Sequence, residues 1–325
     1  MGKLNKKVKA LIGVGTVLGM APDLIDNLLV HRKFDLPEGL KTAISGSDMT
    51  DLHQKGQVYE DWIAAYPKEE FRRTTADGVE LVGWLLRPEK PSNVYVFTSH
   101  GYRSNGKHEF CAFAKYYIDR GYNVFVVDHR GAGESGGKYI GFGYFESRDS
   151  VEWLHWLNER YGADISLVIH GVSMGSATVM LMSSMETLPE NVKLVIADCG
   201  YTSAWNEFAY KLRGMHVPEF PLLPIVSRLN KIKVGYDFRE TSALDAVRKT
   251  TKPILFAHGR DDNFVPCCMA EQLFEACGSE HKELIIIDGA DHAASFLTDQ
   301  PRYEAKLDEM FEKYVLSAEA DNAEA

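Results

Sequence analysis

The sequence has few cysteines, and their spacing is irregular. Its 325 residues include only five of them, Cys111, Cys199, Cys267, Cys268 and Cys277. An odd number at uneven intervals argues against a disulfide framework, and without a C-x-x-C pair the chain also lacks the usual cysteine pattern of a zinc site. We therefore expect a reducing compartment, the cytoplasm, with a membrane-associated or exported protein as the alternative.

The chain also lacks a long block of positive charge. Its formal net charge is −10, and the lysines and arginines form no extended basic stripe. A phosphate backbone would be repelled by such a protein, so nucleic acid is not an expected partner. A small neutral or apolar molecule suits this charge better. Nothing in the sequence indicates an oligomeric state.

No apolar run is long enough to span a bilayer. The longest N-terminal run, Ala10–Ala21, follows the basic stretch Lys3–Lys9 and is soon ended by Asp23 and Asp26. A bilayer requires about 20 apolar residues in a helix. We favour an amphipathic helix that packs on the surface or touches a membrane, and a cleaved signal peptide is the alternative.

Apolar segments recur along the rest of the chain in the rhythm of an α/β fold. Hydrophobic residues make up 45% of the sequence and charged residues 25%, which is typical of a globular protein with a large core. A D-G pair within Phe71–Pro88 predicts a β-hairpin. The later segments predict a mostly parallel central sheet flanked by helices. The expected strands are Val94–Thr98, Val124–Asp128, Leu167–His170, Leu194–Asp198, Ile254–His258 and Leu284–Asp288, and the expected helices are His108–Arg120, Glu146–Tyr161, Ser176–Glu186, Met269–Ala276 and Tyr303–Val315.

One stretch interrupts this alternation and predicts an insertion. Residues 201–252 contain three closely spaced prolines among many aromatic and aliphatic residues, and they are too long for a plain connection. We interpret them as a lid that walls an apolar pocket, and an extra helical pair packed on the core is the alternative. The expected organisation is an N-terminal helical extension over 1–68, a catalytic core over 69–200 and 253–318, the lid, and a flexible tail over 319–325.

The strongest chemical signal is Gly171-Val172-Ser173-Met174-Gly175, a G-x-S-x-G motif between an expected strand and an expected helix. Glycines two positions to either side allow a sharp turn that exposes the Ser173 hydroxyl, as in a nucleophile elbow. The Met174 N–H follows the nucleophile and is positioned to stabilise an oxyanion. The loop after Val94–Thr98 supplies the second candidate donor, the Tyr102 N–H.

A serine hydroxyl is a weak nucleophile and requires a base that is oriented by an acid. His292 follows the last expected strand and is the preferred base, because the chain order on such a fold is serine, acid, histidine. His100 and His258 each precede a glycine, which is typical of turns. The candidate acids are Asp262, the adjacent Asp261, Asp198 and Asp291.

Five motifs together resemble the α/β-hydrolase superfamily, in the same order and relative spacing. They are HGYRSN, DHRGAGES, HGVSMG, HGRDDNFVP and GADH, and the resemblance covers roughly residues 71–316. Within the superfamily, the chain is most similar to bacterial acyl-ester hydrolases of the cinnamoyl (feruloyl) esterase and cell-surface hydrolase groups. The loop with the pattern D-x-x-V-P resembles the family's acid loop, which favours Asp262 as the acid.

The resemblance implies a serine hydrolase that cleaves carboxylic esters through an acyl-enzyme, without a metal or organic cofactor. Ser173, His292 and Asp262 would form the triad, and a small-molecule ester would be the substrate. The same triad cleaves peptides and thioesters, so these activities stay open. A catalytically silent binding module is the alternative from another class. The insertion carries no matching motif, so the sequence leaves the acyl and alcohol groups open.

Overall fold

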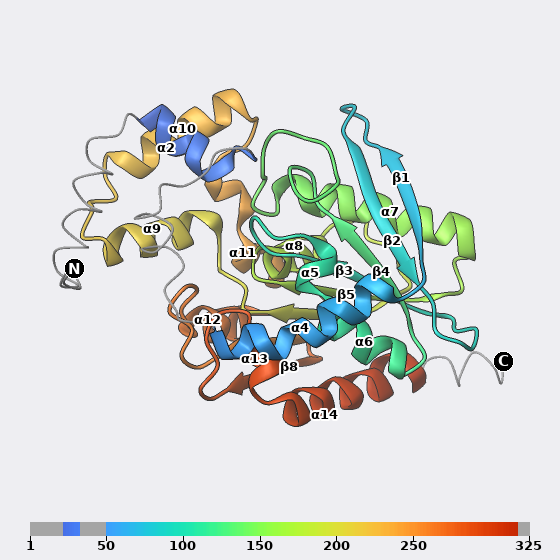
Figure 1. The fold of residues 1–325 in the computed structure, drawn as a ribbon. Helices are drawn as coiled ribbons and strands as arrows, with labels where there is room; N and C mark the ends of the chain where they lie inside the picture. The colour runs from blue at the N-terminus through green and yellow to red at the C-terminus, as the bar shows by residue number, and fades with distance from the viewer. Residues whose placement is uncertain (1–21, 33–49, 318–325) are drawn as a thin grey trace.

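A single eight-stranded sheet organises the computed structural model, which describes residues 22–32 and 50–317 (Figure 1). The strand order is β1-β2-β4-β3-β5-β6-β7-β8, with β1, β2 and β4 paired antiparallel and the remaining pairs parallel. The strands are β1 Lys68–Thr74, β2 Glu80–Leu86, β3 Val94–Ser99, β4 Asn123–Asp128, β5 Ser166–Val172, β6 Val192–Asp198, β7 Ile254–Gly259 and β8 Lys282–Ile287. The predicted mostly parallel sheet is confirmed.

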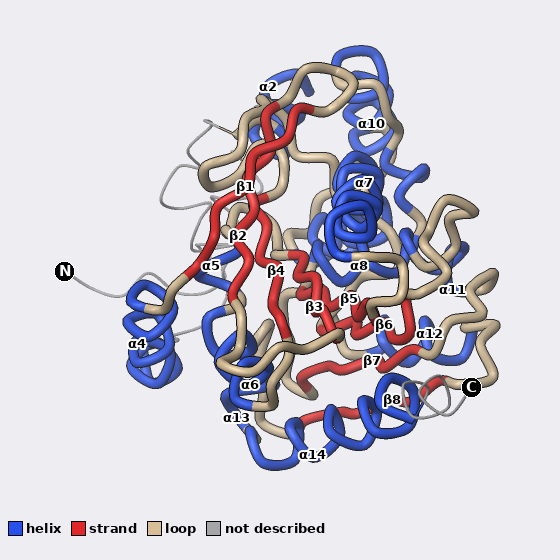
Figure 2. Tube along the Cα trace, turned by 90° about the vertical axis from the view of Figure 1, so that its right-hand side faces the viewer, coloured by secondary structure: helices blue, strands red, loops and turns tan. Residues whose placement is uncertain are grey.

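Helices cover both faces of the sheet (Figure 2). The central strands β3, β4, β5 and β7 are buried along their whole length, so both faces require apolar side chains. In β4, for example, Phe125 belongs to one core and Val124 to the other. The first core includes α7 Tyr144–Tyr161, α8 Met174–Met182 and α12 Cys268–Ala276; the second includes α4 Thr50–Ala65, α6 Cys111–Asp119 and α14 Gln300–Phe311.

The helix expected over His108–Arg120 consists of two helices, α5 Gly106–Glu109 and α6. They meet at Phe110, whose backbone has φ −101° and ψ 10°. The Phe110 side chain is fully buried in the second core, so packing sets the direction of the chain here. The C-terminal helix continues from α14 into a π-helical segment, Glu312–Leu316, which periodicity in the sequence did not indicate.

The insertion between β6 and β7 is helical. It contains α9 Ala204–Gly214, α10 Leu222–Lys233, the 3₁₀ turn Phe238–Thr241 and α11 Ala243–Val247. The short helix α2 Pro22–Val30 packs against α10, although the two are far apart in the sequence (Figure 1). The role of the insertion, residues 201–252, as a lid stays a prediction. The basic stretch Lys3–Lys9, the run Ala10–Ala21 and the tail 319–325 lie outside the described residues.

Over residues 22–32 and 50–317, none of the helices is both long and apolar enough to cross a bilayer.

The motif from Asp128 to Ser135 forms a turn that ties three parts of the chain together. One Asp128 carboxylate oxygen accepts from the Gly106 N–H at 2.8 Å and the other from the Glu134 N–H at 2.7 Å. The Ser135 hydroxyl donates to the Asp128 carbonyl at 2.6 Å and accepts from the Val82 N–H at 2.8 Å. The turn therefore joins β2, β4 and the start of α5.

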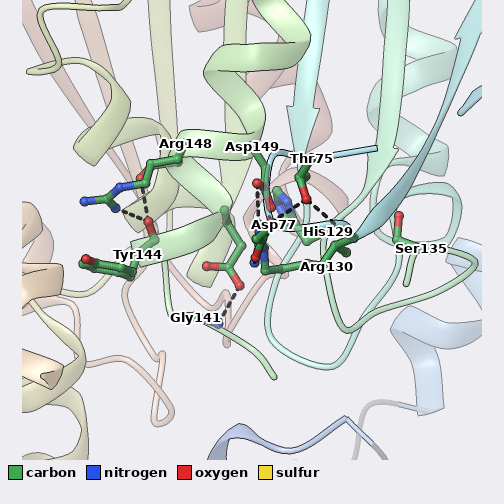
Figure 3. Close-up of polar contacts among 12 residues, drawn as sticks. Thr75, Asp77, His129, Arg130, Ser135, Gly141, Tyr144, Arg148 and Asp149 are labelled. Carbon is green, nitrogen blue, oxygen red and sulfur yellow. Dashed lines mark hydrogen bonds and ion pairs between the residues drawn. The ribbon is translucent and has the colours of Figure 1, made fainter. Parts of the chain in front are cut away.

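Arg130, in the same turn, lies between two aspartates (Figure 3). Its Nε is 2.6 Å from Oδ2 of Asp149 on α7, and its Nη1 is 2.9 Å from Oδ2 of Asp77 in the β1–β2 hairpin. The hydrogen bonds from Arg130 lower the pKa of Asp77 to about 2, whereas burial raises the pKa of Asp149 despite the same partner. Arg130 thus neutralises a carboxylate that would otherwise be buried without a counter-charge.

Replacing Arg130 with methionine should destabilise the fold in a pH-dependent way. Asp149 would remain buried without its cation, which costs about 3 kcal/mol of unfolding free energy near pH 7. The lowered pKa of Asp77 stabilises the wild-type fold above the ordinary pKa of an aspartate, and this stabilisation is lost as the pH falls toward about 2. Asp149, whose pKa is raised, becomes neutral over the acidic range and then no longer requires a cation. The deficit of the variant should therefore shrink at about pH 3.

Urea unfolding of wild type and variant at both pH values measures this difference. Arg248→Met removes an exposed ion pair with Asp245 and serves as the matched control, with almost no expected effect. A deficit of equal size at both pH values would contradict this electrostatic account.

Candidate active site

Ser173 occupies a strained turn between β5 and α8. Its φ of 56° and ψ of −116° are unusual for a residue with a side chain. Glycines on both sides make the turn possible. A Cβ on Gly171 would lie 2.1 Å from the Gly175 carbonyl oxygen, and a Cβ on Gly175 would lie 1.7 Å from the Ser99 carbonyl oxygen. The Ser173 N–H donates to the Asp198 carbonyl at 2.9 Å, which anchors the turn to β6.

Two hydrogen bonds connect Ser173 to a histidine and an aspartate. His292 Nε2 lies 2.8 Å from Ser173 Oγ, and His292 Nδ1 lies 2.8 Å from Asp262 Oδ2. Asp262 follows β7 and His292 follows β8, so the three side chains meet beyond the carboxyl ends of parallel strands. A Ser–His–Asp series with these distances can move a proton from the hydroxyl to the imidazole.

Asp262 is held as a carboxylate by four donors. Its Oδ1 accepts from the N–H groups of Phe264 and Val265, each at 2.8 Å. His258 Nε2 is 3.2 Å from Oδ2, the oxygen that also faces His292. Burial alone would raise the pKa of Asp262, but the hydrogen bonds from the two histidines outweigh it and keep the pKa well below its usual range. A permanent negative charge therefore faces His292 Nδ1.

The other candidate acids lie elsewhere. Asp261 is exposed. Asp198 is buried, and its Oδ2 accepts from the Tyr303 hydroxyl at 2.9 Å; burial raises its pKa to about 6 although that hydrogen bond opposes the shift. Asp291 accepts from the backbone N–H of His292 at 2.8 Å. Of the carboxylates in the described part of the chain, Asp262 is the one bonded to the His292 ring.

The two predicted oxyanion donors belong to residues next to the nucleophile or to a loop that approaches it. Met174 is the first residue of α8, and Tyr102 follows Gly101, on which a Cβ would lie 3.3 Å from the Ser173 Cβ. Neither N–H donates to an acceptor among the described residues. The Tyr102 side chain turns toward α2, where its hydroxyl donates to the Leu29 carbonyl at 2.8 Å.

The two strand-end histidines differ in their surroundings. His100 Nδ1 donates to the Gly101 carbonyl at 2.8 Å and its Nε2 accepts from the His129 N–H at 2.9 Å, so His100 shapes the loop. His258 instead contacts Asp262, and its Nε2 also lies 2.9 Å from the Val265 carbonyl. The sequence interpretation of both as turn residues missed this contact, and no local pattern distinguishes the two histidines.

Sequence reasoning also missed a charged pair that α9 brings to the site. Lys211 Nζ is 3.4 Å from Glu207 Oε1, 2.6 Å from the Phe264 carbonyl oxygen and 3.4 Å from the centre of the Phe264 ring. That ring lies 4.7 Å from the ring of His292. Burial raises the pKa of Glu207 to about 7, against the opposing charges of Lys211 and His292. An i, i+4 pair of this kind usually indicates a solvated helix face.

The site also contains three groups of the kinds that bind metals. Ligand atoms of Cys199, Asp262 and His292 lie within 4.8 Å of one another. However, both imidazole nitrogens already contact Ser173 and Asp262, and burial raises the pKa of the Cys199 thiol far above its usual range. A metal would require the thiolate and would disrupt the hydrogen-bonded series, so the donor set does not fit one.

Comparisons with known proteins identify the family and the fold. The family X-Pro dipeptidyl-peptidase (S15 family) matches residues 77–233. The uncharacterized protein YqkD of Bacillus subtilis is 30% identical over 246 residues, which span 75% of this chain and 79% of YqkD. The protein bem46 of Schizosaccharomyces pombe is 26% identical over 239 residues, 72% of this chain and 73% of bem46. The structure of the Pyrococcus furiosus esterase Pf2001 superposes with a TM-score of 0.63 at 22% identity, covering 78% of this chain and 93% of the esterase.

This chain belongs to the α/β-hydrolase superfamily. The superfamily resemblance of the sequence motifs is thereby confirmed, and the protein is a hydrolase of the α/β-hydrolase type. In this superfamily the nucleophile sits on a strand-to-helix turn, the position that Ser173 occupies here.

The close backbone contact at Gly175 provides a test of the elbow of this α/β-hydrolase. In Gly175→Ala the new methyl would collide with the Ser99 carbonyl, so the turn must shift. We expect a loss of about 3 kcal/mol of unfolding free energy and of fluorophosphonate labelling at Ser173. Urea unfolding and mass spectrometry of the labelled protein measure the two effects.

Gly214→Ala is the matched control, because a Cβ there meets nothing within 4 Å. It should retain full stability and labelling. Normal labelling of Gly175→Ala would show that the elbow tolerates a side chain at this point.

Proposed function

We propose that this protein hydrolyses carboxylic esters with Ser173 as nucleophile, His292 as general base and Asp262 as the acid that orients it. The observation that carries the proposal is the pair of 2.8 Å hydrogen bonds that joins the three side chains. In such a series the aspartate fixes the histidine tautomer and stabilises the imidazolium that forms. The low pKa of Asp262 supports this role, because the residue stays ionised.

The proposed reaction runs in two halves. Ser173 Oγ attacks the ester carbonyl while its proton passes to His292 Nε2, and the N–H groups of Met174 and Tyr102 donate to the oxyanion. The tetrahedral intermediate collapses, the alkoxide leaves with the proton from His292, and an acyl-enzyme remains. A water then gives a proton to His292 and attacks the acyl group, which releases the acid and restores Ser173. In each half His292 takes up one proton and gives it back, first to the leaving alkoxide and then to the Ser173 oxygen.

The insertion is the part of the chain that we expect to select the ester. Its helix α9 places Lys211 against Phe264, whose ring packs on His292. Trp205 and Phe208 on the same helix are partly buried. Residues 201–252 would therefore act as the predicted lid and shape the acyl pocket beside Ser173.

Ser173→Ala should abolish turnover of p-nitrophenyl butyrate, because no other group takes the position of the nucleophile. Initial rates, compared with the unfolding midpoint, separate lost chemistry from lost folding. Ser176→Ala is the matched control: this serine is buried on the next turn of α8, and its hydroxyl has no hydrogen-bond partner among the described residues. Full activity in Ser173→Ala would overturn the proposal, and the same loss in both variants would point to packing.

The choice between neighbouring aspartates provides a second test. Asp262→Asn should lower kcat for the same ester about a thousandfold or more, because an amide cannot stabilise the imidazolium. Asp261→Asn changes an exposed neighbour and should leave kcat within about twofold of wild type. Equal losses in both variants, or a larger loss in Asp261→Asn, would show that the assignment of the acid role to Asp262 is wrong.

Hydrolysis of amides is the second candidate, because the matching family over residues 77–233 is a peptidase family. The same Ser173 would act on an aminoacyl p-nitroanilide in place of an ester. Activity on the anilide alone would favour the peptidase, and activity on the ester favours the proposed function. An absence of both activities, with no fluorophosphonate labelling, would indicate a silent binding module.

A further inference from the structure

A second histidine shares the carboxylate oxygen that orients His292. Oδ2 of Asp262 lies 2.8 Å from Nδ1 of His292 and 3.2 Å from Nε2 of His258. His258 belongs to the end of β7 and is fully buried, so it approaches Asp262 from the sheet, whereas His292 approaches it from the loop after β8. The proposed reaction uses only one of these two contacts, and the other requires an explanation.

The surroundings of His258 decide which ring nitrogen carries a proton. Its Nε2 lies 2.9 Å from the Val265 carbonyl oxygen as well as 3.2 Å from Asp262 Oδ2. Both of these oxygens are acceptors, so Nε2 must be a donor. Its Nδ1 is buried and has no hydrogen-bond partner among the described residues. The proton of His258 is therefore directed at the acid of the triad.

The free energy of His258 also depends on Asp262. A buried nitrogen without a partner destabilises a fold, so a residue that only filled space at the end of β7 would not need an imidazole. Burial would lower the pKa of His258, but the hydrogen bond to Asp262 and its negative charge outweigh burial and raise the pKa. The contact with the acid is therefore the dominant interaction of this side chain.

We propose that His258 is a positioning residue: its Nε2–H fixes Oδ2 of Asp262 and weakens the attraction of that oxygen for the protonated form of His292. A donor on Oδ2 withdraws negative charge from the side of the oxygen that faces His292. His292 then remains an unprotonated base at a lower pH than it would with sole use of Oδ2. This inference rests on the proposed function, in which His292 takes the proton of Ser173.

The same contact fixes the orientation of the carboxylate. Oδ1 of Asp262 accepts from the N–H groups of Phe264 and Val265, each at 2.8 Å. His258 holds the second oxygen independently of His292. The carboxylate therefore keeps its orientation while His292 gains and loses a proton during the proposed reaction.

Other titratable groups near the two histidines do not share this contact. Within residues 22–32 and 50–317, none of them has a hydrogen bond or ion pair with Asp262. They stay in place when His258 is replaced, so a difference between variants reports the loss of His258. These groups are Asp198 at the end of β6, Cys199 after it, Glu207 and Lys211 on α9, and Asp291 before His292.

The pH dependence of fluorophosphonate labelling at Ser173 tests the proposal. His292 must be unprotonated to activate the serine, so the labelling rate falls at acidic pH with the pKa of His292. In His258→Leu this acidic limb should move upward by about one pH unit, because Oδ2 then stabilises the imidazolium alone. The kcat/KM for p-nitrophenyl butyrate should show the same shift. KM above the limb should stay within about twofold of wild type, since the buried side chain cannot reach a substrate.

Two further variants separate the hydrogen bond from packing. His258→Gln keeps an N–H donor near the position of Nε2, so it should move the limb by about half as much or less. His170→Leu is the matched control: this histidine is fully buried on β5, where its ring contacts Phe110 and Phe113 and its Nδ1 lies 2.9 Å from the Tyr117 hydroxyl. It should keep the wild-type limb. Unfolding midpoints show whether each variant is folded, and His258→Asn, whose shorter side chain does not reach Oδ2, replaces His258→Leu if it is not.

A measurement without turnover distinguishes this inference from the proposed function. Nitrogen-15 NMR of Ser173→Ala with labelled histidines reports the protonation of His292 directly, and adding His258→Leu should raise the pKa of His292 by about one unit. A wild-type protein with neither labelling nor hydrolysis would overturn the proposed function and leave this NMR result to decide the role of His258. An unchanged or lowered pKa in His258→Leu, or an equal shift in His170→Leu, would overturn the inference. Shifts of the same size in His258→Gln and His258→Leu would overturn the role of the hydrogen bond.

Discussion

The backbone at Ser173 turns from β5 into α8 with a positive φ, and much of the surrounding architecture accommodates this turn. Gly175 allows the helix to approach the Ser99 carbonyl, and Gly171 makes room for the Gly175 carbonyl. The Asp198 carbonyl holds the Ser173 N–H from the neighbouring strand. A strained residue persists only where its surroundings over-determine it, and here the parallel strands β3 and β5, which are buried along their whole length, supply that rigidity.

Charge at the site is controlled by burial as much as by pairing. Asp262 stays ionised because backbone N–H groups and two histidines surround it. Asp198 has only the Tyr303 hydroxyl as a side-chain donor and Glu207 has only Lys211, so burial raises the pKa values of both. Arg130 has the comparable task at a distance from the site, where it offsets the buried charge of Asp149. The protein thus maintains a small number of buried charges and gives each one a specific environment.

The sequence was most informative where the chemistry is local. The elbow glycines, the strand before Ser173 and the helix after it are neighbours in the chain, and buried parallel strands appear as apolar runs. Family resemblance alone favoured Asp262 over Asp261 as the acid, and the structure adds the hydrogen bond between Asp262 and His292. Glu207, Lys211 and His258 were missed because their contacts with the site depend on packing between distant segments.

The order of the three side chains along the chain affects how the protein is made. Ser173 is synthesised 119 residues before His292, and the helix α14 that follows His292 must still pack on the sheet. A ribosome-bound fragment that ends before β8 contains Ser173 but not His292, the proposed base. On the proposed mechanism, the growing polypeptide would have no reactivity toward esters until the C-terminal segment is made and docks.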